Sequence, residues 1–315
     1  MNDVTEAIFV PAAVILNEYG DVDVLNVVDV PRPKPGPGQV LVQVRAAGIN
    51  PGEAKIRQGA LRDRWPSTFP SGQGSDFAGV VAELGDDVHT AAVGDNVIGF
   101  VHTRSSHAEF VVAAAADLVP KPDNVPWEVA GALFVAGTTA YAAVRAVGVR
   151  SGTTVVVSGA AGGVGSLVVQ LARHAGATVL GIAGPANHEW LTAHGVIPVS
   201  YGDGVVDRVR AAADGKIDAF VDTYGGDYVE KALELGVPAD RIDTIVNFAA
   251  VEKYGVKSEG NNDAASADVL SELTGLLAKG ILEIPIAATY PLSDVRAAYR
   301  ELERQHTRGK IVLVP

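Results

Sequence analysis

From Thr154 onward the chain alternates short β-branched runs with helical segments, and this alternation restricts the possible folds more than any other feature. Strands are expected over residues 155–158, 178–183, 197–201, 217–223 and 241–248. Helices are expected between them, over residues 165–174, 188–195, 205–213 and 228–236. Strands that alternate with helices in this way are typical of a doubly wound parallel sheet. We therefore expect an α/β domain in this part of the chain.

A glycine-rich loop follows the first of these strands. The segment "VVVSGAAGGVGSLVVQLA" places Gly159, Gly162 and Gly165 at intervals of three residues, between an expected strand and an expected helix. In that context glycines make the tight turn, let the backbone approach a pyrophosphate and allow close helix–strand packing. The spacing departs from the strict G-x-G-x-x-G pattern, and a plain strand–helix turn is the alternative. We predict that a dinucleotide binds to Gly159, Gly162, Gly163, Val164 and Gly165.

The end of the second strand bears on the choice of dinucleotide. NAD sites usually place Asp or Glu there to bind both ribose hydroxyls, but this chain has Ile-Ala-Gly-Pro at 182–185. The missing carboxylate permits a 2′-phosphate, so NADPH is the expected cofactor. No arginine or lysine lies in residues 183–188, so the preference should be moderate. The predicted contacts are Gly184, Asn187, His188 and Tyr201, although His188 could instead face solvent in the first turn of a helix.

The first third of the chain has a different sequence pattern. Short β-rich segments are separated by Gly, Pro and Asp turns, including a proline-rich turn at 31–38 and a strand at 40–46. This pattern predicts a compact β-barrel-like domain. The final strands, around 283–315, have no crossover helix to place them in the parallel sheet, so we expect them to return to the first domain. The segment "EGNNDAASAD" at 259–268 is expected to be a mobile loop.

Charge and composition exclude some classes of function. The 315 residues carry a formal net charge of −12, which argues against binding to nucleic acid because phosphate backbones demand a basic surface. There are no cysteines, which removes disulfides, thiolate nucleophiles and cysteine-bound zinc together. Acidic residues precede the apolar run at the N-terminus, unlike a signal peptide, and no membrane span is expected. The cytoplasm is the expected location.

Several segments together resemble zinc-independent medium-chain dehydrogenase/reductases of the NADPH:quinone oxidoreductase type. They are "AAGINPGEAKIRQG", "GSDFAGVVAELGDDV", "VGDNVIGF", "GTTAYAAV", "SGAAGGVGSLVVQLARHAGA", "FVDTYGG" and "HTRGKIVLVP", in family order along nearly the whole chain. The resemblance implies a GroES-like β-barrel catalytic domain over 1–125 and 283–315. It also implies a Rossmann domain over 126–282, with the cofactor between the two.

The resemblance also bears on metal binding. Zinc alcohol dehydrogenases of this superfamily hold a catalytic zinc with Cys, His and Cys, and the matching positions here are Asn50, Ser75 and Val135. None of these is a good zinc ligand, so no metal is expected and the Lewis acid of a zinc enzyme is missing. That favours a substrate that accepts hydride without a metal, such as a quinone or an α,β-unsaturated carbonyl.

Individual roles follow from the same resemblance. In similar reductases the counterparts of Asn50 and Thr139 lie near the nicotinamide ribose and the phosphates. The counterpart of Tyr201 lies near the adenosine ribose phosphate, and that of Phe248 lines the nicotinamide end. Lys55 matches a position that holds Tyr or Lys, so Asn50 and Lys55 are the expected catalytic residues. The alternative for Lys55 is an exposed surface lysine.

Other residues and functions stay open at this point. Asp76 and Asp222 are expected to stabilise loops, with a ribose or solvent contact as the alternative for Asp222. Trp65 and Phe69 either pack or form a substrate lid. An alkenal or enone reductase without quinone activity would share this sequence pattern, as would a non-catalytic NADPH-binding sensor. A metal-dependent alcohol dehydrogenase is disfavoured by the ligand positions. A homodimer is expected by analogy with relatives.

Overall fold

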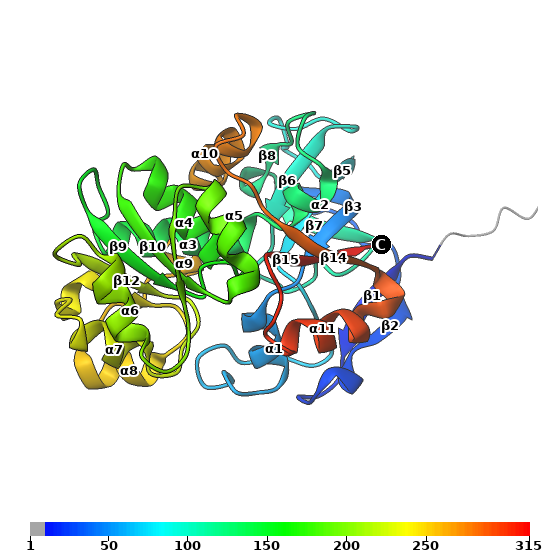
Figure 1. Ribbon diagram of the computed structural model, residues 1–315. Helices are drawn as coiled ribbons and strands as arrows, with labels where there is room; N and C mark the ends of the chain where they lie inside the picture. Colours follow the sequence, from blue (N-terminus) through cyan, green and yellow to red (C-terminus); the bar gives the residue numbers. More distant parts are fainter. Residues whose placement is uncertain (1–9) are drawn as a thin grey trace, which may run out of the picture.

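The computed structural model describes residues 10–315 (Figure 1). Residues 1–9, which belong to the expected catalytic domain, lie outside the described part. Within residues 10–315 the strands form three sheets, and one sheet is entirely parallel. Its order is β11 (Ile197–Ser200), β10 (Thr178–Ala183), β9 (Thr154–Ser158), β12 (Ala219–Asp222) and β13 (Ile242–Thr244). The predicted doubly wound parallel sheet is therefore confirmed.

Helices cover both faces of the parallel sheet, and the strand residues alternate between them. Val155 and Val157 belong to the same core as residues of α4 (Gly165–His174) and α5 (His188–Ala193). Val156, between them in sequence, packs in a second core with residues of α6 (Val205–Ala212) and α7 (Tyr228–Glu234). The central strand is thus buried on both faces, which explains its uninterrupted run of valines.

Two further sheets make up the GroES-like part. The smaller has the order β2 (Asn26–Asp29), β1 (Ala12–Leu16) and β4 (Ser71–Gly72). The larger has the order β14 (Ile286–Pro291), β15 (Lys310–Val314), β3 (Gln39–Gly48), β5 (Asp76–Leu84), β6 (Asn96–Phe100) and β8 (Val119–Pro120), with β7 (Phe110–Ala114) also paired with β3. The final strands therefore return to the first part of the chain, as expected, because β15 pairs with β3.

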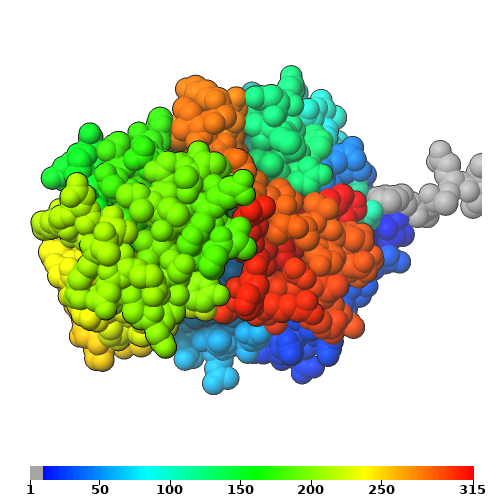
Figure 2. Space-filling view, in the orientation of Figure 1, coloured from blue at the N-terminus to red at the C-terminus, as the bar shows by residue number. Residues whose placement is uncertain are grey.

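The remaining helices connect these sheets. They are α1 (Pro51–Arg57), α2 (Trp127–Gly131), α3 (Phe134–Ala146), α8 (Phe248–Tyr254), α9 (Asn261–Ala264), α10 (Ala267–Ala278) and α11 (Val295–Glu303). The two halves share one hydrophobic core, in which the rings of Phe100 and Phe134 stack with their centres 3.8 Å apart. In Figure 2 the C-terminal segment lies between the two halves, against the green part of the chain. No helix within residues 10–315 is long and apolar enough to cross a membrane.

Two expectations about local structure are wrong. The strand expected over 241–248 ends at Thr244, because the side chain of Asn247 accepts a hydrogen bond from Ala250 N and starts helix α8. The segment expected to be a mobile loop contains helix α9 and the beginning of α10. The buried carboxylate of Asp243 accepts a hydrogen bond from Glu259 N, and Ser266 caps α10, so tertiary contacts order this polar segment.

Candidate functional site

The glycine loop lies at the carboxyl end of the central strand β9, where ligands bind in open α/β sheets. Gly159 has a φ of +60°, a conformation that favours glycine. A Cβ at Gly165 would lie 2.1 Å from the carbonyl oxygen of Gly159, so a side chain there would push the loop away from α4. The N–H groups of Val164 and Gly165 have no acceptor within residues 10–315. They are available to an anion at the N-terminus of α4.

The C-terminal strand brings a lysine against this loop. Gly309 pairs with Gly162 in an isolated parallel bridge, and Gly309 N donates a hydrogen bond to Ala161 O at 3.0 Å. The next residue, Lys310, begins β15, and a Cβ placed on Gly163 would lie 3.1 Å from its Cδ. The lysine is only 4% exposed. The glycine loop therefore also forms one wall of the space that the Lys310 side chain occupies.

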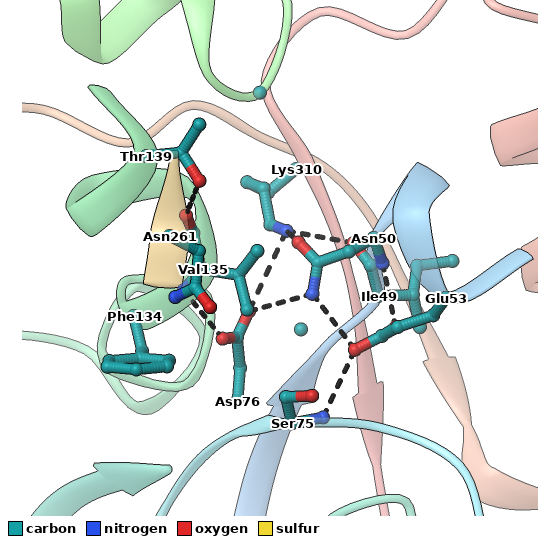
Figure 3. A network of polar contacts seen from close by, with 12 residues as sticks. Ile49, Asn50, Glu53, Ser75, Asp76, Phe134, Val135, Thr139, Asn261 and Lys310 are labelled. Atoms are coloured by element: carbon teal, nitrogen blue, oxygen red, sulfur yellow. Dashed lines mark hydrogen bonds and ion pairs between the residues drawn. The ribbon is translucent and has the colours of Figure 1, made fainter. Parts of the chain in front are cut away.

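The Lys310 ammonium enters a group of polar side chains that we call the buried charge cluster: Asn50, Glu53, Asp76 and Lys310 (Figure 3). Lys310 Nζ donates to Asn50 Oδ1 at 2.5 Å and to Ile49 O at 2.8 Å, and lies 3.8 Å from Asp76 Oδ2. Asn50 Nδ2 donates to Glu53 Oε1 and to Asp76 Oδ2, both at 3.1 Å. Both donors of the Asn50 amide are thus used, and its oxygen faces the ammonium.

Further donors satisfy the two carboxylates. Glu53 accepts hydrogen bonds from Asn50 N at 3.0 Å, from Ser75 N at 3.1 Å and from the Tyr299 hydroxyl at 2.9 Å. Asp76 Oδ1 accepts from Val135 N at 2.7 Å, at the beginning of α3. Five separate elements, α1, β5, α3, α11 and β15, therefore meet at the cluster, and removal of one charge would leave a buried partner uncompensated.

Burial shifts the pKa of each titratable group of the buried charge cluster and of the nearby His107. It raises the pKa of Asp76 to about 6, although Lys310 opposes the shift, and it also raises the pKa of Glu53. Burial lowers the pKa of Lys310, against the attraction of the two carboxylates. It lowers the pKa of His107, whose Nε2 lies 3.2 Å from Gly48 O, to about 4. Such perturbed groups are concentrated at functional sites.

The structure brings some predicted site residues to this place. Asn50 belongs to the cluster, and Thr139 lies on α3 in the same view, where its hydroxyl donates to Val135 O at 2.6 Å (Figure 3). Lys55, one turn along α1, is half-buried, and its side chain has no hydrogen bond or ion pair with residues 10–315. The amide of Asn50 is held by the cluster, a constraint that the sequence does not reveal.

Phe248 makes an unexpected contact with the segment that carries Trp65. The guanidinium carbon of Arg64 lies 4.6 Å from the centres of both the Trp65 and the Phe248 rings. The two rings are 6.5 Å apart in an edge-to-face arrangement. In Figure 1 this light-blue segment extends beneath the body of the GroES-like part toward the yellow segment with α8. Trp65 thus contacts the opposite half, whereas Phe69 packs against Tyr19.

The other predicted residues line the carboxyl edge of the parallel sheet. Gly184 lies beside Tyr201, since a Cβ on Gly184 would be 3.2 Å from Tyr201 Cε1. Tyr201 is 59% exposed, and Asn187 ends a short 3-10 turn before α5. His188 Nε2 lies 3.4 Å from Ala183 O. These residues meet at the ends of β10 and β11, the place predicted for the adenosine ribose.

Sequence reasoning missed a cation at this edge. Arg208, on α6, donates through its guanidinium to the carbonyl oxygens of Ser200, Tyr201, Gly202 and Asp203 at 2.7–3.1 Å. It lies outside residues 183–188, the strand-end segment from which the cofactor preference was predicted. The sequence feature that could have indicated this cation is a basic residue in the first turn of the helix after β11. The role expected for Asp222 is confirmed, because its carboxylate accepts hydrogen bonds from Tyr224 N and Gly225 N in the loop after β12.

The positions that match zinc ligands in relatives do not form a metal site here. Asn50 is bonded to Lys310, Ser75 contributes its backbone N–H to Glu53, and Val135 contributes its backbone N–H to Asp76. Among residues 10–315 no group of three or more His, Cys, Asp or Glu side chains is arranged to hold a metal ion. The residues present therefore do not fit a catalytic zinc.

Comparison with known proteins places this architecture in a family. The family model described as "Alcohol dehydrogenase GroES-like domain" matches residues 36–146, and the one described as "Zinc-binding dehydrogenase" matches residues 191–313. A quinone oxidoreductase of Pseudomonas aeruginosa is 30% identical over 321 residues, which cover 94% of this chain and 97% of that protein.

Solved structures agree with the sequence matches. The quinone oxidoreductase from Coxiella burnetii superposes with a TM-score of 0.86 at 30% identity, over 97% of this chain and 99% of that one. An NAD-dependent alcohol dehydrogenase superposes with a TM-score of 0.86 at 28% identity, over 96% and 99%. The chain belongs to the medium-chain dehydrogenase/reductase family and is a nicotinamide-dependent oxidoreductase of the quinone oxidoreductase type.

Proposed function

We propose that the protein is an NADPH-dependent reductase that transfers hydride to a quinone or an α,β-unsaturated carbonyl without a metal. The observation that carries the proposal is the junction at Gly309 and Lys310. This junction joins the glycine loop at the end of β9 to the buried charge cluster. A dinucleotide on the loop would thus have its reactive end beside Asn50 and Lys310.

The residues fit a nicotinamide dinucleotide at three places. Gly159, Gly162, Gly163, Val164 and Gly165 would hold the pyrophosphate, for which the free N–H groups at the start of α4 are suited. Thr139 and Asn50 would accept hydrogen bonds from the nicotinamide ribose. Phe248 would line the nicotinamide end. When bound, the reduced nicotinamide supplies the hydride, and the protein orients the reactants and excludes water.

The choice of NADPH over NADH would be made at the ends of β10 and β11. No carboxylate follows Ala183, and the exposed Tyr201 stands beside Gly184. Arg208 places a positive charge beneath the Ser200–Asp203 backbone, but its hydrogen bonds go to carbonyls. Its charge would attract a 2′-phosphate without a bidentate contact. Asn187 and His188 complete the proposed subsite.

The acceptor would lie between the GroES-like and nucleotide-binding halves, for which we propose the division 1–125 with 283–315, and 126–282. Lys55 on α1 would protonate the reduced acceptor, because its ammonium has no internal partner in the described chain. The Trp65 segment, held against Phe248, would cover the acceptor. A homodimer in the cytoplasm is the expected state.

An NADPH-oxidation screen with 1,4-benzoquinone, 2-cyclohexen-1-one and trans-2-hexenal tests the proposal. We expect steady turnover with at least one acceptor, faster with NADPH than with NADH and unchanged by a chelator. Reaction with the enone and alkenal alone would favour the enone reductase. Binding of NADPH, seen by its fluorescence, without consumption by any acceptor would favour a sensor. Activity lost to a chelator and restored by zinc would contradict the metal-free mechanism.

A further inference from the structure

Lys310 has one N–H group that finds no hydrogen-bond acceptor in the described part of the chain. An ammonium carries three donors. Two of them go to Asn50 Oδ1 and Ile49 O. The third makes no hydrogen bond within residues 10–315. Asp76 Oδ2 lies 3.8 Å from Nζ, which is close enough for an ion pair but too far for a hydrogen bond. A buried lysine therefore keeps one donor for an atom outside the cluster.

The position of this donor is fixed from two sides. The stem of Lys310 lies against Gly163 in the glycine loop, and the ammonium lies against Asn50 at the start of α1. In Figure 3 the nitrogen stands between Asn50 and Asp76, with Thr139 across the same region. A dinucleotide held by the loop would bring its nicotinamide end, and hence the acceptor, to this region. Because β15 and the cluster hold the lysine, its donor would need no reorganisation when a ligand arrives.

The charges around the ammonium favour its cationic form. Asp76 on β5 and Glu53 on α1 face it with negative charge. His107, before β7, is neutral over the ordinary range because burial lowers its pKa to about 4. Tyr299 on α11 donates its hydroxyl hydrogen to Glu53 and, with its pKa raised well above the usual value, stays uncharged. The two carboxylates thus oppose the lowering of the Lys310 pKa by burial.

We propose that Lys310 donates its third N–H to the oxygen of the quinone or enone acceptor and stabilises the negative charge that develops there during hydride transfer. The inference deepens the proposed function and rests on it. Zinc enzymes of the superfamily polarise the acceptor oxygen with a metal ion. Here the Lys310 ammonium would polarise it instead. The positions that match zinc ligands accordingly serve the lysine: Asn50 through its side chain and Val135 through Asp76.

Substitution of the lysine tests the role through kinetics. We expect Lys310→Met to lower kcat/KM for the acceptor by about 100-fold to 1,000-fold, the usual cost of a lost oxyanion donor. The Kd for NADPH should change by less than about threefold. Lys310→Arg keeps a cation but not its geometry, so it should recover part of the loss. A loss confined to the Kd for NADPH would overturn the proposal and make Lys310 a cofactor-binding residue.

Two controls separate this role from stability. Lys121 also donates its ammonium to two backbone carbonyls, those of Pro122 and Val125, so Lys121→Met removes a similar lysine outside the site. It should leave kcat/KM unchanged. If Lys310→Met does not fold, the double variant Lys310→Met/Asp76→Asn removes both charges of the ion pair. A folded double variant with wild-type kcat/KM would overturn the proposal.

A binding measurement tests the donor without turnover. 4-Nitrophenol carries an oxyanion in its yellow phenolate form, so we would titrate it into cofactor-free protein and follow its absorbance. The wild type should bind the phenolate about tenfold more tightly than Lys310→Met, and 2-cyclohexen-1-one should displace it. Equal phenolate binding by both proteins would overturn the inference. A wild type that consumes no NADPH with any acceptor would instead remove the proposed function.

Discussion

The guanidinium of Arg64 lies over the ring of Phe248, 4.6 Å from its centre, and so connects the GroES-like part to the nucleotide-binding part. The residues just after Trp65 are held to the GroES-like part. Arg104 donates hydrogen bonds to Ser67 Oγ and Pro66 O, and Ser67 N donates to the Tyr19 hydroxyl. Arg64 and Trp65 reach across to Phe248. The contact therefore couples the position of α8 to a loop beside the proposed acceptor site.

We expect Arg64→Gln to loosen this contact with little effect on global stability. A cation–π contact at an exposed site contributes about 0.5–1 kcal/mol, so KM for a quinone should rise about threefold while kcat stays similar. Faster amide hydrogen exchange in residues 60–70 would show the loosening directly. Arg62→Gln is the matched control, since Arg62 is exposed and close by. Equal effects of the two substitutions would contradict a specific role for Arg64.

Gly184→Asp should reverse the cofactor preference. The new carboxylate would repel a 2′-phosphate and accept hydrogen bonds from the free ribose hydroxyls of NADH. Tyr201, the nearest side chain, is exposed and free to move aside. The measurement is kcat/KM for both cofactors. Gly184→Asn, which has the same shape without the charge, should keep the preference for NADPH. A wild type that prefers NADH would contradict our interpretation of this strand end.

Lys55→Met should lower turnover more than it weakens NADPH binding, because a proton donor acts mainly on charge formed in the transition state. A loss of kcat of about tenfold to a hundredfold fits one general acid. Stopped-flow single turnovers and NADPH fluorescence titrations would separate the two effects. Lys34→Met, at an exposed position of the GroES-like part, is the control. Unchanged turnover would make Lys55 an ordinary surface lysine.

Asp243 should make the protein less stable as the pH rises. Burial raises its pKa from 3.8 to about 7, aided by the charges of Glu259 and Asp263 and opposed by the Glu259 N–H and Lys257. Between about pH 4 and 7 the folded state therefore binds more protons than the unfolded state, and the free energy of unfolding falls as the pH rises through this window. Three pKa units correspond to at most about 4 kcal/mol.

The substitution Asp243→Asn should weaken this dependence and stabilise the protein at pH 8, while Asp76, whose pKa burial raises to about 6, retains its own part of it. Urea unfolding at pH 5 and pH 8 measures it, with Asp240→Asn at an exposed neighbouring position as the control. A variant with the same loss of stability between pH 5 and 8 as the wild type would show that another group is responsible.

The sequence predicted the parts of the fold that depend on local patterns. Helix 165–174 and strand 178–183 have the predicted bounds, because the apolar period and the glycine turns specify both. The strand expected over 241–248 ends at Thr244. The N-cap at Asn247 starts helix α8 there, although the apolar residues around it favour a longer strand. The polar segment at 259–268 is ordered by Asp243, a contact that no local pattern contains.

The candidate site was predictable only where neighbouring residues form it. The glycine loop is continuous in sequence, and its spacing together with the strand before it and the helix after it predicted a dinucleotide site there. Lys310 and Asn50 are 260 residues apart. The apolar run that follows Lys310 predicts only a buried strand. The partners of the Lys310 ammonium become known only from the pairing of β15 with β3, which places it beside Asn50. Arg64 was missed for the same reason, since a ring from the other half defines its position. Arg208 instead binds carbonyl oxygens five to eight residues before it, a local contact that a basic residue early in the helix after β11 could have indicated.

The pairing of β15 with β3 has a consequence for synthesis on the ribosome. At about 5–20 residues per second, the 260 residues between Asn50 and Lys310 take roughly 13 to 52 s to be made. During that time Glu53 and Asp76 have no lysine, and the end of β3 at Ala47 and Gly48 lacks the partner that β15 later supplies. The parallel sheet, complete by residue 244, can form in this interval. The nascent chain would thus expose this short strand end beside two uncompensated carboxylates for most of its synthesis, a period in which a chaperone would have it to protect.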